Sequence, residues 1–360
     1  MKKTTLLLLV AFVLTPVLGT LLGAASPTAA ATAEKKWNLS LGSWSETTHP
    51  VTTVCHKNWA DTIEKRTNGR VKITLYPGGV FGQPAAHMEK LRSGVLDISM
   101  FIPALMAGMY PIAEGVGRLP FVGSSPWAAA KALWQMYTER LFDKSWDTEM
   151  HLLWIGSNLG ASPIFLAKKE VVTLADMKGL KLRGSGATMK MALDKVGAVM
   201  VVINTSELQQ GMERGIVDGG VTNYAGAGAS GLIGTAKFII ETKPALALGN
   251  LGLTMNKALW DSFPPDIQQI FNEESGLKGA LAQVEAYEMG DAAAKAKFVA
   301  SGTKIRQFSK ADMDTWIRLT ASVKEDWIKE MAAKGLEAPA RKAADRYVEL
   351  IQKYEAEEKK

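Results

Sequence analysis

The stretch over residues 174–199 constrains the fold most. It predicts a short helix or turn over residues 174–178, a brief strand over 179–183 and a helix over about 187–196. A strand that runs through a small-residue loop into a helix is typical of an open α/β sheet, where ligands bind at the carboxyl ends of strands. Arg183 stands at such an end. Because a guanidinium and a helix N-terminus both attract anions, we expect Arg183 to bind a carboxylate.

The residues before this stretch repeat the alternation of strands and helices. Trp37, Leu39 and Leu41 alternate with polar or small residues, and strands are predicted again over residues 71–75 and 95–100, each after a helix. This order predicts a parallel α/β lobe. The Gly-, Met- and Pro-rich residues that follow, up to Ser125, are expected to wind irregularly over it.

Two pairs of predicted strands are expected to connect this lobe to a second one. Residues 151–155 and 164–167 form the first pair, and residues 238–241 and 246–255 the second. Beyond Asn256 the pattern is helical, over residues 264–299, 311–334 and 338–360, and the first run is long enough to bridge both lobes. We therefore expect an α/β clamp with crossing strands. Lobe I covers 34–158 with a return segment over about 247–285, and lobe II covers 159–246 with C-terminal helices over about 286–360.

The first 33 residues differ from the rest of the 360-residue chain. Lys2 and Lys3 precede an apolar run and an Ala-rich segment that ends Ala31-Thr32-Ala33. This order predicts a secretory signal peptide and a periplasmic protein. A retained membrane anchor is the alternative, but Thr15, Pro16 and Gly19 interrupt the run.

Charge and cysteine content exclude several classes of function. The net charge of +6 includes the two lysines of the signal peptide, and no Lys/Arg block follows, so no nucleic acid partner is expected. The single cysteine, Cys55, forms no intrachain disulfide. The four histidines have no metal-binding spacing, so we expect neither a metal nor another cofactor.

An exported α/β enzyme that acts on a small organic acid is the alternative function. Gly184-Ser185-Gly186 between a strand and a helix resembles a dinucleotide fingerprint. However, Met189 replaces the third glycine, no Gly-Lys-Ser/Thr follows as in a phosphate loop, and the chain has no G-x-S-x-G elbow.

Several short motifs in a fixed order point to a known family. They are Tyr76-Pro77-Gly78, residues 92–98 (RSGVLDI), Leu119-Pro120-Phe121, residues 174–183 (LADMKGLKLR), residues 215–219 (GIVDG), and Asn256 with Trp260. Over nearly its full length, the chain resembles the solute-binding subunits of tripartite ATP-independent periplasmic (TRAP) transporters, which form the DctP-type family. The resemblance implies a periplasmic-binding-protein-like clamp that closes on an organic acid and delivers it to the membrane subunits of the transporter. We expect a monomer. A minority of the family also uses a metal ion to bridge the ligand.

The resemblance also suggests ligand-binding residues. In the family, the Arg of the L-K-G-x-K-x-R motif binds the ligand carboxylate, and Arg183 occupies that position, while Asn223 matches an Asn that often follows the V-D-G motif. Many members carry a second Arg after the lobe crossing, but residues 160–165 contain none. This departure and the aromatic residues near strand ends favour a monocarboxylate with an apolar or aromatic part. The candidate ligand-binding residues are Arg183, Asn223, Trp44, Phe101, Ser162 and Tyr224; His49, beside Pro50, fits a turn better.

Overall fold

The computed structural model describes residues 35–106, 108–158, 160 and 162–359. Contacts divide the chain into Met1–Lys35 and Lys36–Lys360, and the fold described below is that of the second unit. The expected signal peptide lies outside the described residues. Within them, the model contains no helix that is both long and apolar enough to cross a membrane.

The first sheet has five strands in the order β2-β1-β3-β10-β4. β1 pairs in parallel with β2 and β3, as the alternation of strands and helices predicted, whereas β10 runs antiparallel to both β3 and β4. Every residue of β3 is buried, as expected for a central strand that is covered on both faces. The strands are β1 (Trp37–Gly42), β2 (Val71–Tyr76), β3 (Ile98–Phe101), β4 (Met150–Gly156) and β10 (Leu251–Asn256).

The second sheet has six strands in the order β11-β9-β5-β8-β6-β7. β6, β7 and β8 are parallel, and β11 is parallel to β9, while β5 runs antiparallel to both of its neighbours. The strands are β5 (Ile164–Leu166), β6 (Lys181–Arg183), β7 (Val199–Val201), β8 (Gly219–Val221), β9 (Phe238–Glu241) and β11 (Lys304–Gln307).

The chain crosses directly from strand to strand between the two sheets twice, as expected, and it passes to the second sheet once more through α11 to β11. β4 in the first sheet leads to β5 in the second, and β9 in the second leads to β10 in the first. Each arriving strand lies antiparallel to its neighbours, because a direct connection has no helical crossover to reverse the chain direction. The α/β clamp with crossing strands is therefore confirmed, although residues 246–250, which we expected to be part of the second crossing strand, lie before β10 and outside it.

Helices cover both sheets. The N-terminal part contains η1 (Val51–His56), α1 (Lys57–Arg66), α2 (Pro84–Arg92), η2 (Pro103–Leu105), α3 (Pro111–Gly117), α4 (Pro126–Thr138) and α5 (Ser145–Glu149). The middle part contains η3 (Leu174–Met177), α6 (Ala187–Asp194), η4 (Thr205–Glu207), α7 (Leu208–Glu213) and α8 (Tyr224–Ala229). The C-terminal part contains α9 (Lys257–Asp261), α10 (Pro265–Glu274), α11 (Gly276–Ala300), α12 (Lys310–Thr320), α13 (Val323–Ala332) and α14 (Glu337–Glu357).

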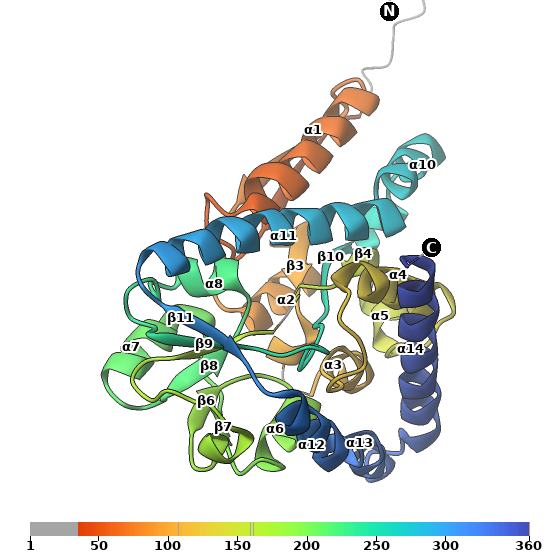
Figure 1. The fold of residues 1–360 in the computed structure, drawn as a ribbon. Coiled ribbons are helices and arrows are strands. Elements are labelled where there is room, and N and C mark those ends of the chain that lie inside the picture. The colour runs from red at the N-terminus through yellow and green to blue at the C-terminus, as the bar shows by residue number, and fades with distance from the viewer. Residues whose placement is uncertain (1–34, 107, 159, 161, 360) are drawn as a thin grey trace, which may run out of the picture. The chain divides into compact units, whose positions relative to one another are not determined.

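Helix α11 is the expected bridge between the sheets. It packs on η1, α4 and β4 at the first sheet and on α8 at the second, and Figure 1 shows it running across the elements of both. The helix begins at Gly276 rather than near residue 264. Gly276 has a φ of +62°, a left-handed conformation that breaks the predicted single helix into α10 and α11.

Three other expectations about local structure were wrong. Helix α3 forms within the segment that we expected to be irregular, and its first turn contains Pro111, which is compatible with that position. Strand β11 interrupts the C-terminal helices, because it pairs with the exposed edge of β9. The helix expected over residues 311–334 divides after Thr320, whose hydroxyl donates to the main-chain oxygens of Trp316 and Ile317.

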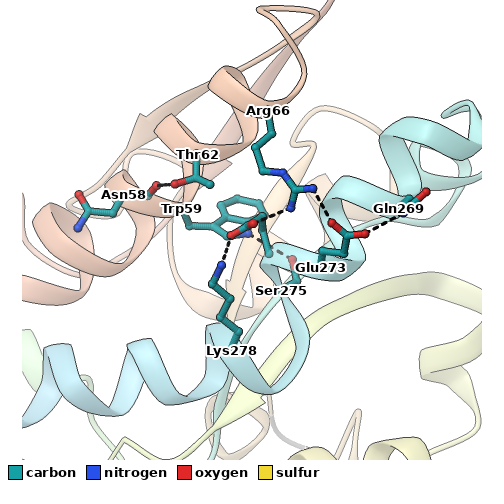
Figure 2. A network of polar contacts seen from close by, with 9 residues as sticks. Asn58, Trp59, Thr62, Arg66, Gln269, Glu273, Ser275 and Lys278 are labelled. Carbon is teal, nitrogen blue, oxygen red and sulfur yellow. Dashed lines mark hydrogen bonds and ion pairs between the residues drawn. The ribbon is translucent and has the colours of Figure 1, made fainter.

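A polar network fastens α1 to the start of α11 (Figure 2). Arg66 donates from Nη1 to Glu274 Oε1 at 2.6 Å and from Nη2 to Glu273 Oε2 at 2.5 Å. Lys278 also pairs with Glu274, and Trp59 Nε1 donates to Ser275 Oγ at 3.2 Å. The buried Trp59 contact is expected to contribute more than the exposed ion pairs, which are screened by solvent. The network holds the break between α10 and α11 against the first lobe.

Candidate functional site

A cavity of about 150 Å³ lies between residues of the two sheets. Its walls come mainly from the segments that follow β1, β3 and β4 in the first sheet and β6, β7 and β8 in the second, together with Tyr287 of α11. The carboxyl ends of strands in open α/β sheets are the usual place for a ligand. The main residues lining the cavity are Trp44, Ser45, Glu46, His49, Ile102, Leu105, Arg118, Asn158, Arg183, Ser185, Asn204, Thr205, Thr222, Asn223 and Tyr287.

Arg183, the last residue of β6, lies in this cavity and is only 5% exposed. Its Nε donates to the main-chain oxygen of Ile203, just after β7, and its Nη1 donates to that of Val221, at the end of β8, both at 3.0 Å. These bonds fix the plane of the guanidinium from two neighbouring strands. Within the described part of the chain, no hydrogen bond occupies Nη2. Burial lowers the pKa of Arg183 to about 10, so the group stays charged at neutral pH.

A second arginine, Arg118, lines the same cavity, and the sequence did not predict it. It follows α3 and is 4% exposed, and its Nε has no hydrogen-bond partner among the described residues. Gly186, in the loop after β6, makes room for it. A Cβ added at Gly186 would lie 2.7 Å from Arg118 Cγ, and the φ of +90° there also favours glycine. The only available signal was its position before Leu119-Pro120-Phe121, which does not distinguish a binding arginine from a structural one.

The two arginines leave an excess of positive charge in the cavity. Burial lowers the pKa of Arg118 to about 9, and the charge of Arg183 lowers it further than the nearby Glu114 raises it. Glu114 itself accepts from the main-chain N–H of Ala187 at 3.3 Å. A buried charge without a partner is costly, and an anion placed between two cations removes both the desolvation and the repulsion penalties. The site is therefore suited to an anion.

Asn223 and Trp44 also line the cavity. Asn223 Oδ1 accepts from the main-chain N–H of Gly226 at 2.6 Å and so caps α8, while its Nδ2 donates to the main-chain oxygen of Asn158 at 2.9 Å. Asn223 thus joins the first crossing segment to α8. Trp44 is half-buried and makes an edge contact with His87, with ring centroids 5.1 Å apart. Ligand binding by both residues stays a prediction.

Three predicted binding residues lie outside the cavity walls. Phe101 is fully buried among Tyr110 and Trp146, because its strand faces the core on both sides. Ser162 donates to the main-chain oxygen of Ala247, which joins the two crossing segments. The Tyr224 hydroxyl donates to Glu241 Oε1 at 2.7 Å, at a separate cavity beside α11. Phe101 ends β3 as expected, but Ser162 precedes β5, and Tyr224, expected at the end of a strand, begins α8; none of the three lines the cavity that contains Arg183.

Glu46 and His49 supply polar groups on the wall formed after β1. They share one turn, in which the His49 N–H donates to the Glu46 main-chain oxygen at 3.1 Å. His49 Nδ1 accepts from the Val51 N–H at 3.0 Å, so Nε2 carries the proton of the neutral ring. Burial lowers the pKa of His49 to about 4 and raises that of Glu46. His49 thus acts in a turn, as the sequence suggested, and also lines the cavity.

Comparison with known proteins identifies the family. The model of the family described as "Bacterial extracellular solute-binding protein, family 7" (DctP) matches residues 41–331. The chain belongs to this family. DctP proteins are the solute-binding receptors of TRAP transporters and act in the periplasm, so the resemblance seen in the sequence motifs is confirmed.

Two solved structures and one curated relative show the extent of the similarity. A TRAP solute-binding protein from Rhodoferax ferrireducens, solved with copurified benzoate, is 26% identical, with a TM-score of 0.82 over 89% of this chain and 98% of that one. A marine-metagenome TRAP protein, solved with 3-hydroxybenzoate, is 22% identical, with a TM-score of 0.81 over 89% and 99%. A solute-binding protein from Chromohalobacter salexigens is 28% identical over 253 residues, which cover 70% of this chain and 74% of the relative.

Proposed function

We propose that this DctP protein binds an organic acid by its carboxylate through Arg183 and Arg118 and delivers it to the membrane subunits of a TRAP transporter. The observation that carries the proposal is the pair of buried arginines that line one cavity, with Gly186 after β6 making room for the Arg118 side chain. A carboxylate would accept a charge-assisted hydrogen bond from Arg183 Nη2, the donor that the bonds to Ile203 and Val221 leave unused, and the buried charge of Arg118 would attract the carboxylate further.

We propose a monocarboxylate with an apolar or aromatic part as the ligand class. Arg118 revises the expectation that the site has one arginine, but it does not require a second acidic group on the ligand. Arg118 packs against Gly186, three residues after Arg183, and burial together with the charge of Arg183 lowers the pKa of Arg118, so the two guanidinium groups can bracket one carboxylate. Trp44, Ile102 and Leu105 provide apolar walls. The benzoate and 3-hydroxybenzoate bound to the two similar structures support this class.

We propose further that the protein acts as a monomeric receptor and not as an enzyme. The family model describes solute-binding proteins, and the similar structures hold small acids as bound ligands. The signal peptide expected at the N-terminus would place the receptor in the periplasm, where the membrane subunits can accept the acid.

Arg183→Gln tests the proposal. Calorimetric titration of the purified protein, stripped of copurified ligand, with benzoate and related aromatic acids should give binding that the variant weakens on the order of 10²-fold or more, since truncating one partner of a buried charge pair costs ~2–5 kcal/mol. Arg214→Gln is the matched control, because Arg214 is exposed after α7 and lies outside the cavity. If Arg183→Gln binds within threefold of the parent, the assigned role is wrong.

A further inference from the structure

The cavity contains a second polar group of residues, distinct from the two arginines, which we define as the turn pair: Glu46 and His49. Both residues line the cavity from the same turn after β1. The His49 ring lies 5.0 Å from the ring of Tyr287 of α11, measured between centroids, and Tyr287 lines the same cavity. The turn pair and Tyr287 thus form one part of the cavity wall.

Glu46 brings a carboxylate to this wall that no side chain of the described residues pairs with. Burial raises its pKa, and a hydrogen bond from its own main-chain N–H lowers it by less. Glu46 follows β1 of the first sheet, whereas Arg183 ends β6 of the second, so the two residues line the cavity from different sheets. A half-buried carboxylate that faces a ligand cavity favours a ligand group that can donate a hydrogen bond.

His49 brings an unused donor from the same turn. Its Nδ1 is occupied by the Val51 N–H, which fixes the neutral tautomer and leaves the proton on Nε2. No atom of the described residues accepts from this Nε2, and Nε2 is not among the polar atoms sealed from solvent. Glu46 and His49 line both this cavity and a neighbouring one beside α8 and α11, so one acceptor and one donor three residues apart lie on the wall between them. A single group that donates to one and accepts from the other satisfies both.

We propose that the turn pair selects acids that carry a hydroxyl group away from the carboxylate, with the hydroxyl donating to Glu46 and accepting from His49. This inference rests on the proposed function, because Arg183 and Arg118 must hold the carboxylate for the hydroxyl to reach the turn pair. Among the acids considered above, it narrows the ligand class to hydroxylated aromatic acids. An unsubstituted acid would leave the donor and the acceptor unpaired in the closed site. Unpaired buried polar groups cost free energy, and for this reason a site built to bind a hydroxyl disfavours a ligand that lacks one.

Matched ligand pairs test the inference. Calorimetric titration compares benzoate with 3-hydroxy- and 4-hydroxybenzoate, and phenylacetate with its 3- and 4-hydroxy derivatives; the methoxy analogue of each hydroxy acid accepts but cannot donate. We expect the parent protein to bind at least one hydroxy acid tenfold or more tightly than both the unsubstituted and the methoxy acid. Glu46→Gln should lower this preference at least fivefold. Glu89→Gln is the matched control, because Glu89 is exposed on α2 and outside the cavity, and it should keep the preference.

A second variant tests the donor. His49→Asn keeps an oxygen that can accept from the main-chain N–H two residues on, as an Asn turn does, but removes the Nε2 proton. It should also lose the preference for the hydroxy acid. If the parent shows no preference, or if the preference survives in both variants, the turn pair does not read a hydroxyl and the inference is wrong, although the carboxylate site stands. If none of the acids binds, the proposed function itself fails.

Discussion

Arg118 shows how much a single residue can change the interpretation of the site. The motif that contains Arg183 was readable in the sequence, but Arg118 reaches the cavity only because α3 packs near the loop after β6 and Gly186 leaves space for its side chain. Its charge is unfavourable in the empty site, where burial and Arg183 both lower its pKa. The same charge becomes favourable when an anion enters. Removing the charge of Arg118 should therefore weaken ligand binding without lowering the stability of the ligand-free protein.

Arg118→Gln should separate these two effects. We expect binding of the carboxylate to weaken at least tenfold, because one charge-assisted contact is lost. The ligand-free variant should be no less stable than the parent, since the substitution removes a buried charge that is repelled by Arg183. Titration calorimetry and thermal unfolding measure the two quantities, with Arg214→Gln as the control for loss of an arginine. Weaker binding together with a large loss of ligand-free stability would instead indicate that Arg118 is needed for folding.

At the scale of elements, Asn223 connects the cavity to the crossing segment and to α8. Asn256 offers a matched comparison, because its Oδ1 caps α9 through the Leu259 N–H and its Nδ2 donates to the Leu91 oxygen, outside the cavity. Asn→Asp at either position keeps the cap and removes the Nδ2 donor, which is buried in Asn223 and half-buried in Asn256, so we expect losses of about 1–3 kcal/mol in the free energy of unfolding, the larger one for Asn223.

Only Asn223→Asp should also affect the ligand. The new carboxylate would lie in the cavity of Arg183, where it repels the ligand carboxylate and competes for the arginines, so we expect at least tenfold weaker binding. Asn256→Asp should bind normally once its folded fraction is taken into account. Chemical denaturation and calorimetric titration of both variants measure the comparison. Equal effects on binding would mean that the cavity does not sense a charge at residue 223.

The sequence predicted those elements whose causes are local. The alternation of Trp37, Leu39 and Leu41 identified β1, and the residues around Arg183 identified the unit from β6 to α6. Features that depend on distant contacts were missed. Strand β11 exists because β9 offers an edge, and the break at Gly276 depends on a positive φ that composition does not reveal. For the same reason the sequence placed Phe101 at a strand end, but could not show which way its side chain points.

At the scale of the whole molecule, the four histidines together make the stability of the fold sensitive to acid. Burial lowers the pKa of His49, His87 and His151 to about 4 and that of His56 to about 3. Protons bind these rings more readily in the unfolded chain, where the pKa is about 6.5. The stability that the neutral histidines contribute is therefore complete above pH 6.5 and is lost as the pH falls toward 4. Asp291 has the opposite effect on the pH dependence of stability. Burial raises its pKa to about 7, so the folded state holds the proton more tightly than the unfolded chain, and this contribution to stability is lost as the pH rises toward 7.

His56→Phe isolates one of these contributions. His56 is fully buried near Trp154, with ring centroids 6.2 Å apart, and neither ring nitrogen has a hydrogen-bond partner among the described residues. The parent should lose about 1.4 kcal/mol of unfolding free energy per pH unit from this ring as the pH falls from 6.5 toward 3. Phenylalanine has no proton to gain, so the variant should lose correspondingly less stability between pH 6.5 and 4.5, and above pH 7 the pH dependence of stability should be the same in both proteins. Denaturant unfolding at several pH values gives both slopes. Parallel curves for the two proteins would show that His56 is not the buried neutral ring described here.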